Sequence, residues 1–288
     1  MRILRFVPLL GVAVAGSLNG QFVPDLLENR SYWGDGKSEI DFYQVEFLRD
    51  AENVVCEVIM IFTPVFVDPN SLAVVENKQP GAVPAIRMIH TATIPRGLSA
   101  EPRSVDALWR MDSMSLARLS FSGSDIFGSV SKSVRERRET SGVIWSYQCD
   151  SYTGRSEPQP VPLGEKTVVA YEELPLRLRT LDFGKSTGEA DIELAPSLVS
   201  AAKEFGQMKP AKIAWKMAER TIDIEVQHSL GKDLFTLDSN FPHLLRDWQA
   251  WDRTHWKMKN SIRADYTKYL KKGDRERAFK DPMLRHPD

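Results

Sequence analysis

Short runs in which apolar and polar residues alternate recur along most of this chain. Thr221–Gln227 alternates strictly, and Val143, Trp145 and Tyr147 share one face of the run Gly142–Tyr152. Alternation gives a strand one buried and one solvated face, as antiparallel sheets require. The predicted strands are Glu39–Leu48, Val54–Phe62, Ala85–Ile94, Ala107–Met111, Leu116–Phe121, Phe127–Val134, Gly142–Tyr152, Ala190–Leu194, Ala211–Met217, Thr221–Gln227, Asp233–Leu237 and His255–Ile262.

The period changes in one stretch, Tyr171–Leu181. Leu174, Leu178 and Leu181 recur at helical spacing, and Pro175 is tolerated in a first turn. Regularly spaced strands around such a helix predict a mainly β fold. We expect a curved antiparallel sheet or an open half-barrel with one or two inserted helices.

The leucine stripe of this helix is expected to face the concave side of the sheet. Leu174, Leu178 and Leu181, together with Trp145, are therefore the predicted ligand-facing residues. Truncating Leu178 to Ala is expected to cost about 2–5 kcal/mol of stability. Arg177 and Arg179 are expected to point away from the stripe, toward solvent or carboxylate partners, because burying an unpaired guanidinium is costly.

The first twenty residues predict a signal peptide. Arg2 and Arg5 precede the apolar run Phe6–Ala15, which is too short to span a bilayer, and small residues follow it. We expect an exported protein, periplasmic or secreted, whose mature chain begins between Gly16 and Phe22. The expected organisation is a signal peptide over 1–20, a single β-rich domain over 21–270 and a charged tail over 271–288.

The charge balance excludes a nucleic-acid footprint, which requires a basic excess. Lys and Arg number 38 against 39 Asp and Glu, for a formal net charge of −1. No later segment is apolar for long enough to span a membrane once the leader is removed. An apolar small molecule or an envelope protein is the expected partner, and the sequence indicates no cofactor.

The two cysteines, Cys56 and Cys149, leave two alternatives open. Each lies within a predicted strand. In an oxidising compartment they could form one disulfide, provided that their strands approach each other. They could equally be two separate thiols that pack as small apolar groups.

No motif in this sequence identifies an activity. Dinucleotide-binding, phosphate-binding and metalloprotease signatures are missing from it, as is a nucleophile elbow. The weak catalytic candidates are His243 and Asp247, four residues apart, and His255. Their spacing is compatible with a metal, but a turn with solvated acids explains them better, so no metal site is predicted. The cluster of Trp248, Trp251 and Trp256 fits core packing better than a stacking platform.

Three stretches together resemble a family of exported bacterial proteins of unknown function. Related sequences sometimes carry the label septum formation inhibitor Maf, but the Ser-x-Ser-Pro-Arg-Arg loop of Maf pyrophosphatases is not present in this chain, so that activity is not carried over. The order of strands and helix is also similar to periplasmic half-barrels that carry lipoproteins, a likeness of fold only. The three stretches are Tyr32–Glu39, Tyr171–Phe183, and Phe241–Arg246 with its continuation through Arg263–Tyr266.

Two functional hypotheses follow from the sequence. The leading one is an exported, non-enzymatic β protein that holds an apolar ligand or binds an envelope partner. The alternative is a cell-envelope hydrolase with His243, Asp247 and His255 in its site. An apolar pocket would favour the first, whereas His and carboxylate groups converging in a cleft would favour the second.

Overall fold

The computed structural model describes residues 22–265, apart from 76–78, 97–98, 126–127, 140–141, 152–153, 164–165, 200–204 and 206. The predicted signal peptide and charged tail lie outside the described residues. None of the helices among the described residues is long and apolar enough to cross a membrane.

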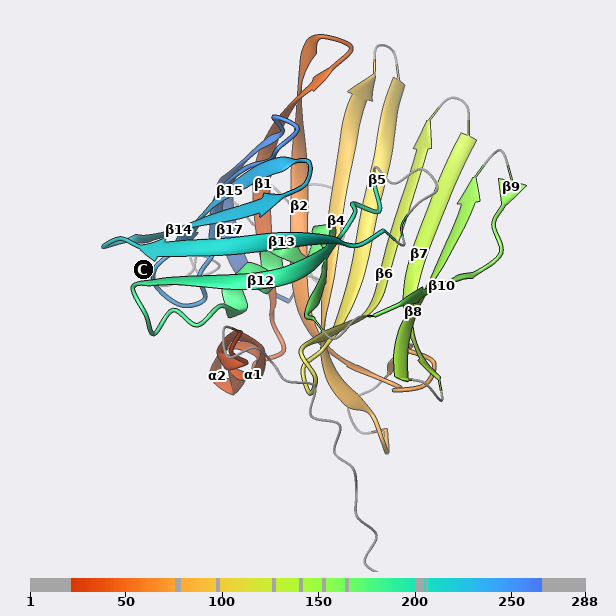
Figure 1. Ribbon diagram of the computed structural model, residues 1–288, viewed down its shortest axis with the longest axis horizontal. Coiled ribbons are helices and arrows are strands. Elements are labelled where there is room, and N and C mark those ends of the chain that lie inside the picture. Colours follow the sequence, from red (N-terminus) through yellow and green to blue (C-terminus); the bar gives the residue numbers. More distant parts are fainter. Residues whose placement is uncertain are drawn as a thin grey trace, which may run out of the picture.

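One large, open sheet dominates the molecule, which confirms the predicted fold class (Figure 1). The strands are β1 (Ser38–Arg49), β2 (Glu52–Val67), β3 (Val74–Val75), β4 (Val83–Arg96), β5 (Ser99–Arg110), β6 (Ser115–Asp125), β7 (Gly128–Glu139), β8 (Gly142–Ser151), β9 (Gly154–Arg155), β10 (Gln159–Pro162), β11 (Val168–Ala170), β12 (Thr187–Ala195), β13 (Lys209–Met217), β14 (Thr221–His228), β15 (Gly231–Asp238), β16 (Leu245–Gln249) and β17 (His255–Ala264).

The strand pairings are mostly local and antiparallel. From β8 the sheet continues through β7, β6, β5, β4 and β2 to β1. It then passes from β1 to β17 and through β16, β15, β14 and β13 to β12. Among the described strands only the β11–β12 pair is parallel. The first and last long strands of the chain are therefore neighbours at the middle of the sheet.

Five short strands lie outside the predicted strand ranges: β3, β9, β10, β11 and β16. The proline-rich stretch Pro158–Gly164 contains β10, which pairs with β8. Proline is compatible with a short strand at a sheet edge, where one side of the backbone needs no partner. Strand β16 contains Trp248, which the sequence places in the aromatic cluster.

The inner face of the sheet carries the main hydrophobic core. Side chains two residues apart in a strand share a face, so Tyr43, Val58 and Met88 all point inward. Two smaller apolar clusters lie outside this core. One of them surrounds Ile40 and Ile262 on the neighbouring strands β1 and β17. Strand β1 thus buries apolar side chains on both of its faces.

The predicted helix is present as three consecutive short helical turns, which we call the inner helical segment. They are η1 (Tyr171–Glu173), α3 (Leu174–Arg177) and η2 (Leu178–Thr180), with Pro175 at the start of α3. In Figure 1 this green segment lies between the orange and yellow strands and the teal and blue ones. Its leucines Leu174 and Leu178 are fully buried in the core. The segment therefore fills one end of the concave face.

An ion pair fixes the inner helical segment to β1. The Arg179 guanidinium donates to both Glu39 carboxylate oxygens, at 2.6 and 2.8 Å, and both side chains are almost completely buried. The expected carboxylate partner of Arg179 is present, but the side chain does not reach solvent. Arg177 is also buried: it donates to the Met114 carbonyl at 2.6 Å and lies over the Phe22 ring. The prediction thus holds for Arg179, which has a carboxylate partner. It is wrong for Arg177, which is buried against backbone and ring groups and whose Nε has no hydrogen-bond partner among the described residues.

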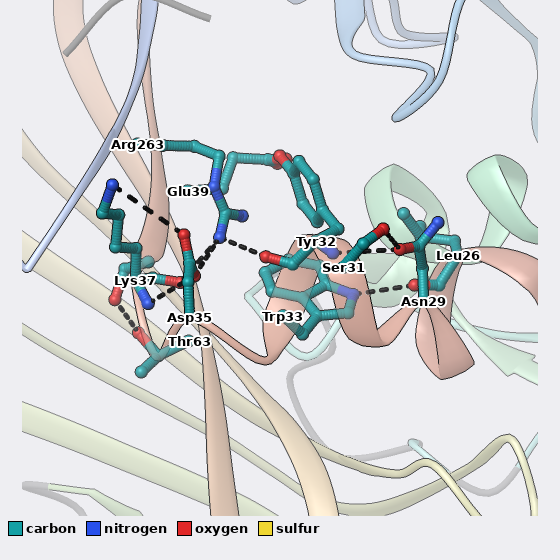
Figure 2. Close-up of polar contacts among 11 residues, drawn as sticks. Leu26, Asn29, Ser31, Tyr32, Trp33, Asp35, Lys37, Glu39, Thr63 and Arg263 are labelled. Atoms are coloured by element: carbon teal, nitrogen blue, oxygen red, sulfur yellow. Dashed lines mark hydrogen bonds and ion pairs between the residues drawn. The ribbon is translucent and has the colours of Figure 1, made fainter. Parts of the chain in front are cut away.

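Two short helices precede the sheet, α1 (Asp25–Glu28) and α2 (Arg30–Trp33). Figure 2 shows how they are attached: the Trp33 indole donates to the Leu26 carbonyl at 2.7 Å, and Arg263 of β17 donates to the Tyr32 carbonyl and to Asp35. The Arg263 guanidinium also lies 3.8 Å from the centre of the Tyr32 ring. The Tyr32 hydroxyl donates to Glu39, so these helices join the same buried cluster as Arg179.

Candidate ligand-binding cavity

A cavity of about 460 Å³ lies on the inner face of the sheet, beside the inner helical segment. Its walls come from both halves of the chain. The lining residues are Val45 and Phe47 of β1, Cys56, Val58 and Met60 of β2, Met88, His90, Ala92 and Ile94 of β4, Arg103, Ser104 and Val105 of β5, Phe121 of β6, Tyr171, Glu172 and Pro175 of the inner helical segment, Ser197 and Val199 after β12, and Trp248, Ala250, Trp251, Asp252, Thr254 and Trp256 around the β16–β17 turn.

Strand alternation explains the apolar wall of the cavity. Along β4 the residues Met88, His90, Ala92 and Ile94 are two apart, so all of them face inward. The strand register then decides which residues of β2 lie beside them: Ala92, for example, pairs with Val58. The antiparallel pairing of β2 with β4 therefore places the inward-facing residues of the two strands side by side in this wall.

Tryptophans form the opposite wall. Trp248 and Trp256 stack with ring centres 5.1 Å apart and nearly parallel planes, and Trp256 meets His90 across the cavity edge. Both tryptophans are buried, whereas Trp251 is partly exposed at the turn. Trp248 and Trp256 thus belong to the core, as the sequence favoured, and they also line the cavity together with Trp251.

A buried carboxylate holds this wall in place. Asp233 of β15 accepts hydrogen bonds from the Tyr171 hydroxyl at 2.7 Å and from the Trp248 indole at 3.1 Å, and it lies 2.6 Å from His228 Nε2. Burial and the nearby Asp233 carboxylate raise the pKa of Tyr171, so its hydroxyl stays protonated as a donor. The network joins the inner helical segment to β15 and β16 at the cavity.

Glu172 brings an unsatisfied polar atom to the cavity. One of its carboxyl oxygens, Oε1, accepts from the Ser197 hydroxyl at 2.6 Å and from the Val199 amide at 3.2 Å. The other, Oε2, is buried and has no hydrogen-bond partner among the residues that the structure describes. Burial raises the pKa of Glu172, which favours the neutral acid. A protonated carboxyl there could donate a hydrogen bond to a bound molecule.

His90 adds a second polar group that carries no charge near neutral pH. Burial lowers the pKa of His90 to about 4. A neutral imidazole against the edge of Trp256 behaves as a mostly apolar wall element. The cavity wall therefore carries no charge at His90 near neutral pH.

Charge is concentrated at one rim, where β1, β4 and β5 have their ends. Glu101 is buried and is bonded by three arginines: Arg49 at 2.9 and 3.1 Å, Arg96 at 2.7 Å and Arg103 at 3.2 Å. Hydrogen bonds from Arg49 and Arg96 lower the pKa of Glu101 to about 2, against the effect of burial. We call Arg49, Arg96, Glu101 and Arg103 the rim cluster.

The predicted catalytic residues do not come together in this cavity. His255 Nε2 lies 2.8 Å from Asp247 Oδ2, so the structure pairs two of the three. His243 lies apart, with Nδ1 3.1 Å from the Asp238 carbonyl and its ring against Phe183. Within the described ranges, no three His, Cys, Asp or Glu side chains are grouped so that they could hold a metal ion.

The residues predicted to face a ligand are core residues. Leu174, Leu178 and Leu181 are buried, and Trp145 packs against Phe205 at a centroid distance of 6.2 Å. None of these four lines the cavity. The neighbours Tyr171, Glu172 and Pro175 face it instead, because a helical turn presents different residues to the core and to the space beside it.

Cys56 and Cys149 are free thiols. Of the two alternatives, the structure therefore shows two separate thiols and not a disulfide. Cys56 lies on β2 and Cys149 on β8, with β4, β5, β6 and β7 between them in the sheet. Cys56 lines the cavity, and burial raises the pKa of its thiol. Cys56 thus serves as a small apolar wall residue.

Sequence reasoning missed the polar groups of the cavity. Neither Glu172 nor Arg103 is among the residues predicted from the sequence to face a ligand. A signal was present for Arg103: it is two residues before the inward-facing Val105 and therefore shares its face. No comparable signal marks Glu172, whose burial depends on the segment around Ser197.

Comparison with known proteins gives a likeness of fold. The structure is similar to a β-barrel-like protein of DUF1849, a domain of unknown function, from Brucella abortus. The two chains are 6% identical, the match covers 80% of this chain and 98% of that chain, and the TM-score is 0.46. No protein-family model matches this sequence, and no curated protein matches it.

Proposed function

We propose that this chain is an exported, non-enzymatic protein that binds an apolar small molecule on the inner face of its sheet. The observation that carries the proposal is the cavity of about 460 Å³ beside the inner helical segment. Export rests on the leader sequence alone. The binding role rests on the shape and chemistry of the cavity.

The cavity has the size and composition typical of ligand sites. Such pockets span about 300–1,000 Å³ and combine mostly apolar walls with a few polar groups. Here Val58, Met60 and Trp256 represent the apolar walls, and Glu172 is the buried polar group with an unsatisfied oxygen. A buried polar atom without a partner is costly, so a ligand that bonds Glu172 would gain affinity there.

The polar networks nearby are better suited to structure than to hydrolysis. Asp233 already accepts from Tyr171, Trp248 and the Trp251 amide, so its oxygens are engaged. The Asp247–His255 pair does not line the cavity. A hydrolase needs a base directed at the bound substrate, and neither carboxylate has that placement.

Binding of the fluorescent apolar dye N-phenylnaphthylamine tests the proposal. Wild-type protein should bind the dye saturably with increased emission. Val58→Phe adds bulk to a buried position in the cavity wall and should weaken binding by about tenfold or more. Thermal unfolding of each variant shows whether the fold is retained.

A matched control is available on the same strand. Val55 of β2 is 46% exposed and does not line the cavity. Val55→Phe should therefore bind the dye like the wild type. Equal binding by wild type, Val55→Phe and a folded Val58→Phe would contradict binding in this cavity.

A further inference from the structure

The rim cluster lies where a ligand in the cavity would end. Arg103 itself lines the cavity. Arg49 and Arg96 are two residues beyond Phe47 and Ile94, which also line it, so both arginines continue the inward faces of β1 and β4. Each of these two arginines is the last residue of its strand. The apolar walls therefore lead directly to a group of guanidinium side chains.

The hydrogen bonds within the rim cluster are unequal. Arg49 makes a two-pronged contact with Glu101, at 2.9 and 3.1 Å, and Arg96 makes a contact of 2.7 Å. Arg103 makes one longer bond of 3.2 Å. Glu101 would keep its partners if Arg103 turned toward another anion. The Arg103 side chain is 36% exposed, so a ligand group can reach it.

We infer that the ligand is an anionic amphiphile, with its apolar tail in the cavity and its carboxylate or phosphate head at Arg103 in the rim cluster. This inference rests on the proposed function and gives it a chemical class. Guanidinium groups bind carboxylate and phosphate through paired, charge-assisted hydrogen bonds. The volume is in the lower part of the range for ligand pockets and so favours a single chain.

Acidic groups around the cavity set the position of the head. Asp252 also lines the cavity, where its carboxylate accepts from the Thr254 amide at 2.9 Å. Glu172 is buried beside Ser197, and its raised pKa favours the neutral form. An anion is thus repelled at Asp252 and attracted at Arg103.

Displacement of N-phenylnaphthylamine by three probes of one chain length tests the inference. The probes are dodecanoate, dodecyl phosphate and the neutral dodecanol, used as monomers in solution. The anions should bind about tenfold more tightly than dodecanol, and added salt should weaken only the anions. The tighter of the two anions distinguishes a carboxylate head from a phosphate head.

Two substitutions should act in opposite directions. Arg103→Met keeps an apolar stem and removes the charge, so the anions should bind about tenfold more weakly while dodecanol is unaffected. Glu101→Gln removes the competing carboxylate and should tighten the anions. Arg87→Met is the matched control, because Arg87 lies on β4 facing away from the cavity and pairs with Asp106.

The outcomes separate the inference from the proposed function. Equal binding of dodecanol and the anions, or anion binding that is unchanged in folded Arg103→Met, would overturn the inference and leave the apolar cavity as a binding site. Failure of the dye and of all three probes to bind would overturn both.

Discussion

The two ends of the concave face are filled in different ways. At one end the inner helical segment packs Leu178 into the core and pairs Arg179 with Glu39. At the other end the same strands border a cavity, where Glu172 has an unsatisfied oxygen and Arg103 makes one long hydrogen bond. At the first end the Arg179–Glu39 pair is matched within the chain, whereas at the second Glu172 Oε2 has no hydrogen-bond partner among the described residues.

This difference separates structural from functional polarity in the same sheet. Buried charges that stabilise a fold must be matched within the chain, as Arg179 and Glu39 are. Buried polar groups that lack a hydrogen-bond partner and line a cavity are suited to bind a polar group of a ligand. The paired Arg179 and Glu39 thus contrast with Glu172, whose unsatisfied oxygen belongs to a residue that lines the cavity.

The largest effect is expected at the filled end. Arg179→Met leaves the Glu39 carboxylate buried without its partner and should lower the free energy of unfolding by about 3–5 kcal/mol. Chemical denaturation measures the loss. Arg246→Met is the control, since Arg246 pairs with Asp238 at 2.6 Å but is 47% exposed, and such pairs contribute about 0–1 kcal/mol. Similar losses in both variants would contradict a special role for the buried pair.

A smaller difference in stability should distinguish the packed core from the cavity when the same Ala→Leu substitution is made in each. Ala107 on β5 is fully buried in the core, and Ala107→Leu should cost about 1–3 kcal/mol through overpacking. Ala92 on β4 lines the cavity, so Ala92→Leu should cost less than about 1 kcal/mol and reduce dye binding. Equal destabilisation by the two substitutions would show that the space at Ala92 is not available.

The last comparison concerns pH. Burial raises the pKa of Glu173 to about 8 from its usual 4.5. The folded state therefore favours the protonated acid, and this stabilisation is lost as pH rises through about 8. Glu173→Gln should remove a downward slope of at most about 1.4 kcal/mol per pH unit between pH 5 and 8. Unfolding free energies measured across this range give the slope.

Glu101→Gln is the contrasting variant for that measurement. The pKa of Glu101 is lowered to about 2, so its stabilisation is lost only as pH falls toward that value. Between pH 5 and 8 the slope of Glu101→Gln should equal that of the wild type. A Glu173→Gln slope identical to the wild type would contradict the raised pKa of Glu173.

Local patterns were enough to predict most of the fold. Strict alternation in Thr221–Gln227 corresponds to β14, and the leucines spaced along Tyr171–Leu181 correspond to the inner helical segment. These signals depend on neighbours within a few residues, which any single sequence contains. Strand β16 was missed because its two apolar residues, Leu245 and Trp248, are three positions apart and share the core face only through a bulge in the β15–β16 pairing.

The buried polar groups could not be predicted in the same way. Glu39 and Asp41 are inward-facing acids in a strand, and their burial depends on Arg179, which is 140 positions away from Glu39. Similarly, Glu172 faces the cavity only because the chain after β12 returns to cover it through Ser197. Long-range packing decides these contacts, and alternation within one strand carries no information about it.

The adjacency of β1 and β17 has a consequence for how the chain reaches its native state. The Ser261 hydroxyl of β17 donates to Asp41 of β1 at 2.5 Å, across 220 positions of sequence. Pairings between such distant segments slow folding, because a large loop must close before they contribute. Until β17 arrives, one edge of β1 exposes unpaired backbone groups, which is a known route to aggregation. A chaperone that shields this edge would therefore be needed until β17 has paired with β1.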